Sequence, residues 1–385
     1  MADASLKRQP NGRYRARYRD ADGQQHERRF AVKAEGQLWL DEQAAAVVTG
    51  THVDPRAGRV TFREHAEDWR LRQHHRPATQ ARVETMLRLH VYPTFGDRPL
   101  SAIRPSHIEA WSKRLADSLA PATVRGLHRY LSGILQAAVR DRLLASSPMD
   151  GVRQPKRETK RGVVPLSVEE VLRLADAVPD RWRAAVLLAA GTGMRQGEVF
   201  GLTVDRVDWL RRTVRVDRQL VLVPGAPPTL AEPKTEASVR TIPLPQVVVD
   251  ALAAHLAAHP AGPDGFVFTS PEGQPQRRTA FSARVWRPAV RTAGLDQYDD
   301  GQGATFHDLR HHYASLLIRF GESVKTVQAR LGHASAAETL DTYSHLWPDS
   351  DDRTRDAVDS ALGAAVQGSG QSTTGPAAGG LSVAR

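Results

Sequence analysis

The sequence contains no cysteine among its 385 residues and no long apolar segment. Without cysteine the chain has no disulfide, no thiol nucleophile and no cysteine-bound zinc, as in many proteins of a reducing compartment. The longest apolar run, Ala184 to Ala190, has seven residues, far fewer than the roughly 20 that a membrane-spanning helix needs. The first residues lack the hydrophobic region of a secretory signal. We therefore expect a cytoplasmic protein with no membrane partner.

Lysine is also scarce, because only seven of the 53 basic residues are lysine and all the others are arginine. The formal net charge is +10, and the planar guanidinium group of arginine binds phosphate well. This balance favours nucleic acid as the partner. A general preference for arginine over lysine would give the same count, so charge alone does not decide the partner.

The N-terminal residues 1–55 form a small basic module. Residues 7–33 include nine basic and three acidic side chains. Arginines alternate with other residues around an Asp22-Gly23 turn, which predicts a β-hairpin followed by a helix over residues 34–48. Such a ribbon could lie in a DNA groove, although a solvated hairpin would show the same alternation. The arginines assigned to DNA here are Arg13, Arg15 and Arg17.

A helical domain is predicted over residues 58–151. Within it, Pro121 begins a helix that has one apolar side, and the other side carries Arg125 and Arg129. A basic linker follows over residues 152–164. Its charge suggests that it runs along phosphates, and its DNA-binding candidates are Lys156 and Arg157.

The third predicted domain covers residues 165–350 and mixes helices with strands. It opens with the capping box Ser167-x-x-Glu170, and strands are expected near residues 212–223 and 239–243. A short helix is predicted over residues 351–363, and the Gly- and Ser-rich residues 364–385 predict disorder. The expected fold is therefore multidomain and mainly α with small β elements: a β-hairpin or sheet with a helix, an all-helical domain, and a mixed α+β domain.

Four short segments of the third domain carry polar residues that core packing does not explain. Gly193 ends an apolar helix and the next helix begins near Gln196, which places Arg195 at a helix N-terminus. A cation is unfavourable there unless an anion binds, and Glu198 could hold its guanidinium in place. In the second segment Lys234 lies in a turn between strands, where its ammonium can donate a proton that a guanidinium effectively cannot.

The third and fourth segments bring histidines, an arginine and a tyrosine. His307 and Arg310 share one helix face, which makes an anion site with a proton donor. His307 and His311 also have the spacing of a metal pair, but no carboxylate pattern completes such a site, so no metal is expected. In the fourth segment His333 lies at a corner between two helices, and Tyr343 follows about two turns along the second. By itself Tyr343 could be an ordinary core tyrosine.

In this order and with these flanking residues, the four segments strongly resemble the tyrosine recombinase (phage integrase) family. The resemblance covers about residues 160–350. The helical domain resembles the core-DNA-binding domain of the family, and the N-terminal module resembles the arm-site-binding domain of integrases of the bacteriophage lambda type. Gln196 departs from the basic or apolar residue that is common after the first arginine.

The resemblance implies a site-specific recombinase that needs no metal, ATP or other cofactor. Tyr343 would attack a DNA phosphate to form a 3′-phosphotyrosine and a free 5′-hydroxyl. Arg195 and Arg310 would clamp the phosphate, His307 and His333 would donate hydrogen bonds or exchange protons, and Lys234 would be the general acid.

The implied partners are double-stranded DNA attachment sites, three further copies in a tetramer at a Holliday junction, and DNA-bending and directionality factors. Arg240 is assigned to DNA contacts. The helix over residues 351–363 is expected to dock on a neighbouring catalytic domain, and the DNA-bound protein is expected in the nucleoid. Three alternatives stay open. They are a type IB topoisomerase, a chromosome-dimer resolvase, which generally lacks an arm domain, and a non-catalytic DNA-binding regulator.

Overall fold

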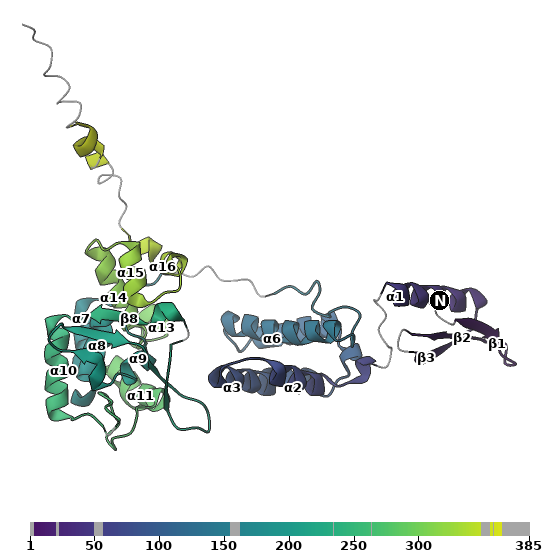
Figure 1. Ribbon diagram of the computed structural model, residues 1–385, viewed down its shortest axis with the longest axis horizontal. Coiled ribbons are helices and arrows are strands. Elements are labelled where there is room, and N and C mark those ends of the chain that lie inside the picture. Colours follow the sequence, from purple (N-terminus) through teal and green to yellow (C-terminus); the bar gives the residue numbers. More distant parts are fainter. Residues whose placement is uncertain are drawn as a thin grey trace, which may run out of the picture. The chain divides into compact units, whose positions relative to one another are not determined.

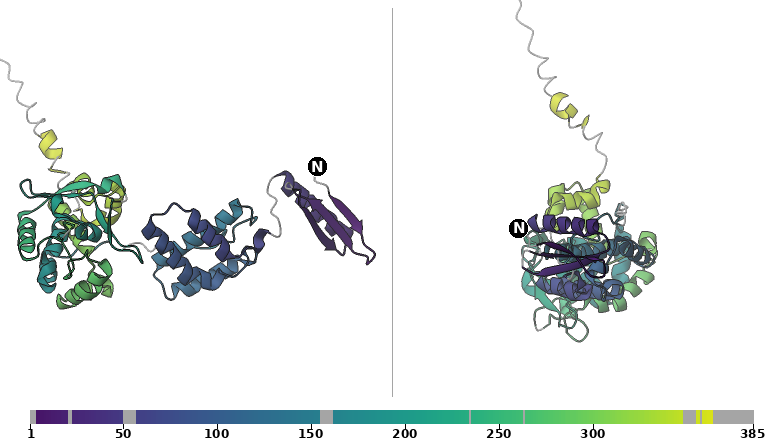
Figure 2. Two further views of the ribbon diagram at one scale, coloured as in Figure 1. Left: turned by 60° about the horizontal axis from the view of Figure 1, so that its bottom comes forward. Right: turned by 90° about the vertical axis from the view of Figure 1, so that its right-hand side faces the viewer.

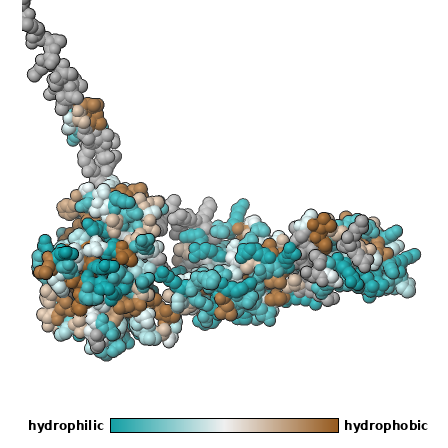
Figure 3. Space-filling model, viewed as in Figure 1, coloured by the Kyte–Doolittle hydropathy of each residue, from teal (hydrophilic) through white to brown (hydrophobic). Residues whose placement is uncertain are grey.

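The computed structural model describes residues 4–20, 23–49, 57–154, 162–233, 235–262, 264–347, 355–356 and 358–363. The chain forms two compact units, residues 1–160 and most of residues 161–385 (Figure 1). On the face shown in Figure 3, hydrophilic residues cover most of the helical domain. In the described part of the chain, no helix has both the length and the apolar character of a membrane span.

The N-terminal module is a three-stranded antiparallel sheet with one helix along it (Figures 1 and 2). Its elements are β1 (Ser5–Arg8), β2 (Tyr14–Arg19), β3 (Gln25–Phe30) and α1 (Lys33–Val48). Ala16 and Tyr18 of β2 are buried in one cluster with Leu40 of α1. Because side chains alternate along a strand, the arginines between them face away from the helix. The predicted hairpin is β2–β3, and strand β1 adds a third strand to it.

The helical domain is held together by one apolar core. Its elements are η1 (Ala57–Arg59), α2 (Phe62–Arg72), α3 (Pro77–Met86), η2 (Leu87–Val91), α4 (Tyr92–Phe95), η3 (Leu100–Ala102), α5 (Pro105–Ala116) and α6 (Pro121–Arg140). As expected, α6 begins at Pro121, and its apolar side, including Leu127 and Leu131, is fully buried. Trp111 packs edge-on against Phe95, and its indole N–H donates a hydrogen bond to the His90 carbonyl, which satisfies the buried polar group.

The second unit is built around α8 (Asp180–Thr192), in which nine of the 13 residues are buried. This helix packs on α7 (Val168–Ala177), α10 (Gln246–Ala258) and α14 (Asp308–Arg319). A helix that is apolar on all sides is stable only inside a core. Up to residue 347, the other helices that the structure describes are α9 (Gln196–Phe200), η4 (Val204–Arg206), η5 (Glu236–Ser238), α11 (Arg278–Phe281), η6 (Ser282–Trp286), α12 (Arg287–Thr292), α13 (Tyr298–Gly301), α15 (Val324–Leu331), α16 (Ala336–Tyr343) and η7 (Ser344–Leu346).

The strands of this unit form two small antiparallel sheets. One has the order β4 (Val207–Asp208), β5 (Thr213–Val216), β8 (Arg240–Pro243), and the other pairs β6 (Gln219–Val221) with β7 (Thr229–Ala231). The strand expected near residues 212–223 is thus two strands, β5 and β6. In β8, Arg240 and Ile242 are buried and the alternate residues are exposed, so the pleat carries Arg240 into the interior.

Two predicted segments fall partly outside the described residues. Within the predicted C-terminal helix the structure has a helical turn, η8 (Asp359–Gly363). The described residues do not include 351–354, 357 or the predicted disordered tail 364–385. Most of the basic linker lies outside them as well, including Lys156 and Arg157.

Candidate active site

Gly193 positions the first arginine of the site. It ends α8 in the left-handed conformation with φ of 64°, and an added Cβ would lie 2.5 Å from the Tyr313 ring. Glycine is therefore required here both for the backbone conformation and for space. The chain then turns so that Arg195 is the N-cap of α9, as the sequence predicts. The Arg195 side chain is 34% exposed, so part of its guanidinium remains open.

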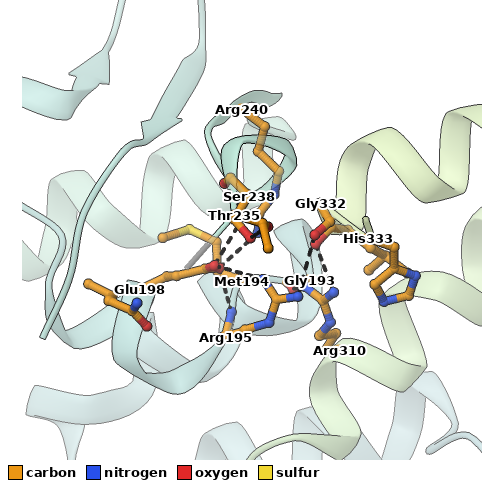
Figure 4. Close-up of polar contacts among 12 residues, drawn as sticks. Gly193, Met194, Arg195, Glu198, Thr235, Ser238, Arg240, Arg310, Gly332 and His333 are labelled. Carbon is orange, nitrogen blue, oxygen red and sulfur yellow. Dashed lines mark hydrogen bonds and ion pairs between the residues drawn. The ribbon is translucent and has the colours of Figure 1, made fainter. Parts of the chain in front are cut away.

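Glu198 is a buried carboxylate that holds two arginines. Its Oε2 accepts hydrogen bonds from the Arg195 backbone N–H and from Arg240 Nη2, both at 2.8 Å. Its Oε1 accepts from Arg195 Nη1 at 3.1 Å and from Arg240 Nη1 at 3.2 Å. Burial alone would raise the pKa of Glu198, but the hydrogen bond and charge of Arg240 and the charge of Arg195 together lower it. The carboxylate is thus ionised and fixes both guanidinium groups (Figure 4).

Three arginines meet three successive carbonyls at the C-terminal end of α15. Arg240 Nε donates to the Arg330 carbonyl at 2.8 Å, Arg310 Nη2 to the Leu331 carbonyl at 2.7 Å, and Arg195 Nη2 to the Gly332 carbonyl at 3.5 Å. The last carbonyls of a helix have no intrahelical donor and carry partial negative charge, so they favour cations. Gly332 makes this corner possible, since it adopts a φ of 66°.

Arg310 is the most enclosed of the three, with 2% of its surface exposed. Its Nη1 donates to the Gly193 carbonyl at 2.8 Å, so the ends of α8 and α15 share one guanidinium. Burial, followed by the charges of Arg195 and Arg240, lowers the pKa of Arg310 to about 9. Arg310 therefore stays charged at neutral pH, in a pocket where like charges are crowded.

The two predicted histidines stay neutral at pH 7. His333 is buried, its Nδ1 lies 2.8 Å from Thr339 Oγ1, and burial followed by Arg310 and Arg195 lowers its pKa to about 3. His307 is an exposed residue, yet desolvation by the surrounding protein, followed by the charges of His311 and Arg310, lowers its pKa to about 4. A neutral imidazole can both donate and accept a hydrogen bond.

Tyr343 ends α16 with 1% of its surface exposed. Burial raises its pKa to about 12, and Arg310 and Arg195 only partly offset this. The His333 ring lies nearly parallel to the phenol, with centroids 6.5 Å apart. The phenol oxygen lies 2.7 Å from Nδ1 of His311, a contact that the sequence did not reveal.

Comparison with known proteins identifies the family. Residues 165–349 match the phage integrase family, and residues 62–155 match the phage integrase central domain. The chain is 31% identical over 351 residues to a putative prophage phiRv2 integrase of Mycobacterium tuberculosis, covering 87% of this chain and 89% of that one. The chain belongs to the phage integrase family. It is a tyrosine-type site-specific recombinase that acts in the integration of mobile elements.

Other proteins that this recombinase resembles are integrases as well. An integrase of Mycobacterium phage D29 is 26% identical, with 86% of this chain and 90% of that one covered. Among solved structures, a Tn1549 transposon integrase matches 78% of this chain and 99% of its own at a TM-score of 0.66 and 21% identity. A lambda integrase dimer matches 90% of this chain and 95% of its own at a TM-score of 0.59 and 18% identity. These structures show that the fold is shared.

Five of the six predicted catalytic residues lie together at the C-terminal end of α15, and this region is the corner of the site: Arg195, His307, Arg310, His333 and Tyr343. Lys234 lies outside the described residues. The segment that follows Lys234 does reach this corner, because Ala237 and Arg240 lie against Gly332. Glu198 holds Arg195, as the sequence suggested. The assignment of Arg240 to DNA needs correction: its side chain is 5% exposed and its nitrogens bond to Glu198 and backbone carbonyls.

The remaining DNA-binding candidates lie in the first unit of the recombinase. Strand register and alternation place Arg15 and Arg17 on the sheet face away from α1, together with Lys7, Arg19 and Arg29. One acidic residue, Glu27, lies among them and pairs with Arg17 at 2.9 Å. Arg13 is exposed in the turn before β2, Arg129 is exposed on α6, and Arg125 is half-buried.

Proposed function

We propose that this recombinase cleaves DNA by attack of Tyr343 on a phosphate held between Arg195 and Arg310. The observation that carries the proposal is the convergence of three guanidinium groups, two neutral imidazoles and a buried phenol at the end of α15. The assembly is rigid, because each arginine is fixed by backbone carbonyls or by Glu198. Preorganised donors of this kind stabilise charge that develops in a transition state.

The charge of the corner matches the reaction. Three guanidinium groups against the one carboxylate of Glu198 leave two positive charges in excess. A phosphodiester carries one negative charge, and its pentacoordinate transition state carries two. Arg195 keeps part of its guanidinium open to meet that charge. Arg240 and Arg310 are both enclosed in this structure; Arg240 contributes its field, and the second contact with the phosphate is given to Arg310 on the family motif. The two histidines, being neutral, add hydrogen bonds without further cationic crowding.

The products would be a 3′-phosphotyrosine and a free 5′-hydroxyl. The ester conserves the energy of the broken bond, so rejoining to a partner strand needs no ATP. Lys234 is our candidate for the acid that protonates the leaving 5′-oxygen, on the family motif and on an ammonium that can give up a proton. Neither step needs a metal ion or another cofactor.

The proposed partner is double-stranded DNA carrying attachment sites, bound by four copies of the chain. Support comes from the relatives: solved lambda integrase structures show a dimer on a core site and a tetramer on a Holliday junction, and the Tn1549 integrase is bound to a circular intermediate DNA. The basic sheet face around Arg15 and Arg17 is our candidate for a second DNA contact, at arm-type sites. Bending and directionality factors, and docking of residues 351–363 in trans, belong to the same proposal.

Covalent capture tests the chemistry. The full chain is mixed with DNA spanning its coding region and flanks, without metal or ATP, and SDS-resistant adducts are mapped on both strands. Wild type and Tyr313→Phe should give an adduct at a defined position, linked to the 3′ side and leaving a 5′-hydroxyl. Tyr343→Phe should give none.

Tyr313→Phe is the matched control, because Tyr313 is also a buried tyrosine of this unit and its ring is retained. An adduct of equal yield with Tyr343→Phe would refute the nucleophile. A 5′-linked adduct would refute the assigned polarity.

A further inference from the structure

His311 contacts the reacting oxygen of Tyr343, and none of the roles given above uses it. It follows Arg310 on α14, and the phenol reaches it from the last residue of α16. The Tyr343 oxygen and His311 Nδ1 are 2.7 Å apart. The two rings meet edge to face with centroids 5.6 Å apart. The contact is therefore made by the hydroxyl and the ring nitrogen, and the ring faces do not stack.

The other two histidines of the site meet different partners. His333 lies over the phenol ring with a parallel plane, and its Nδ1 is 2.8 Å from Thr339 Oγ1. His307 meets His311 edge to face at 4.9 Å. Of these three imidazoles, His311 is therefore the one whose nitrogen lies within hydrogen-bond distance of the nucleophile.

A base that takes the proton of the phenol has to lie close to the Tyr343 hydroxyl. A tyrosine keeps its proton near neutral pH and must lose it to attack a phosphate. Because Tyr343 is 1% exposed, bulk water does not reach the hydroxyl in this structure. General base catalysis needs an acceptor about 2.6–3.2 Å from the proton-bearing atom, and Nδ1 of His311 meets that distance.

We propose that His311 is the general base of the cleavage step. The inference rests on the proposed function, because it takes Tyr343 as the nucleophile. As the phenolic oxygen bonds to phosphorus, its O–H bond breaks and Nδ1 of His311 takes the proton. The P–O5′ bond breaks, and the 5′-oxygen takes a proton from the general acid, the role given to Lys234. During rejoining, the His311 imidazolium returns its proton to the phenolic oxygen as the tyrosine leaves.

The test compares single-turnover adduct formation by full-length wild type and His311→Gln. The probe is the DNA used for covalent capture, and each protein is prepared with tyrosine or difluorotyrosine at position 343. Glutamine keeps a polar group near the hydroxyl but cannot take up a proton. We expect His311→Gln to slow the adduct by about 10²–10⁴-fold. Difluorotyrosine ionises more readily, so it should restore most of that loss.

A leaving-group substitution separates base from acid. A 5′-bridging phosphorothiolate leaves without protonation, so it should rescue a Lys234→Ala variant and leave His311→Gln slow. His312→Gln is the matched control, because His312 is the next residue on α14 and its Nδ1 bonds to the Leu166 carbonyl at 2.7 Å. His312→Gln should form adduct at the wild-type rate.

Three results would overturn the base assignment. His311→Gln could react as fast as wild type. It could be slow with both tyrosines, which would make His311 a positioning residue. If His311→Gln does not fold, His311→Gly with added imidazole replaces it, and a failure of imidazole to restore the adduct counts against the base. A wild-type chain that forms no adduct refutes the proposed function and this inference together, whereas a fast His311→Gln refutes the inference alone.

Discussion

Replacement of Glu198 by glutamine should destabilise the catalytic unit more than any exchange of a surface carboxylate. The carboxylate is 3% exposed and its two oxygens accept four hydrogen bonds, from Arg195 and Arg240. A glutamine amide replaces one oxygen with a donor, so two of the four contacts become donor against donor. The charge that balances two guanidinium groups is lost as well.

Removing one member of a buried ion pair typically costs about 3–5 kcal/mol, because the remaining charge is left unpaired. We expect Glu198→Gln to fall in this range. The control is Asp176→Asn, which removes a surface ion pair. In this pair Asp176 Oδ1 lies 3.0 Å from Arg183 Nη2, and the two side chains are 66% and 46% exposed. Exposed pairs are worth about 0.2–1 kcal/mol, so the control should stay close to wild type.

The assay is hydrogen exchange of α8 peptides from the full chain at increasing urea. It reports unfolding of the catalytic unit separately from unfolding of the N-terminal module and the helical domain. Glu198→Gln should shift the midpoint strongly and Asp176→Asn weakly. If the two variants lose equal stability, our view of Glu198 as the central anchor of the arginines is wrong.

Three further predictions follow from the same corner and from the basic sheet. The pKa of His333 in the folded chain, about 3, lies below its unfolded value, so the protein loses stability as the pH falls below about 6.5. This histidine should account for about 2 kcal/mol of the stability lost between pH 7 and pH 5. Urea titrations of His333→Gln at the two pH values should lack this contribution. Gly332→Ala places a Cβ 3.0 Å from the Ala237 carbonyl at a positive φ and should lower melting temperature and adduct yield while DNA binding in gel shifts persists. Replacing Arg15 and Arg17 by glutamine should lower the slope of log affinity for arm-type DNA against log salt by about 2, and an unchanged slope would exclude this face.

Sequence patterns located most of the site because helix ends are local. Gly193 as the end of α8 and the start of α9 near Gln196 follow from residues within one turn of each position, and the structure has them as predicted. The order of the four segments along the sequence identified Arg195, Arg310 and His333 as catalytic candidates, and the structure brings these residues together at the end of α15. Lys234 stays a prediction, because it lies outside the described residues.

The missed features depend on contacts between distant segments. His311 and Tyr343 are 32 residues apart in the sequence, and no local pattern encodes their contact. Arg240 had a usable signal, since it shares a strand face with the buried Ile242, but the basic character of the sequence favoured DNA contact instead. Strand β1 has four residues, too few to show an alternation, and it forms because β2 offers it an edge.

The most direct test of the central claim is to identify the residue that carries DNA. The covalent adduct is digested with nuclease and trypsin, and the modified peptide is sequenced by mass spectrometry. Cleavage after Arg330 and Arg353 releases residues 331–353, a peptide in which Tyr343 is the one tyrosine. The account predicts a nucleotide phosphate on Tyr343 of this peptide. A nucleotide on any other residue would contradict it.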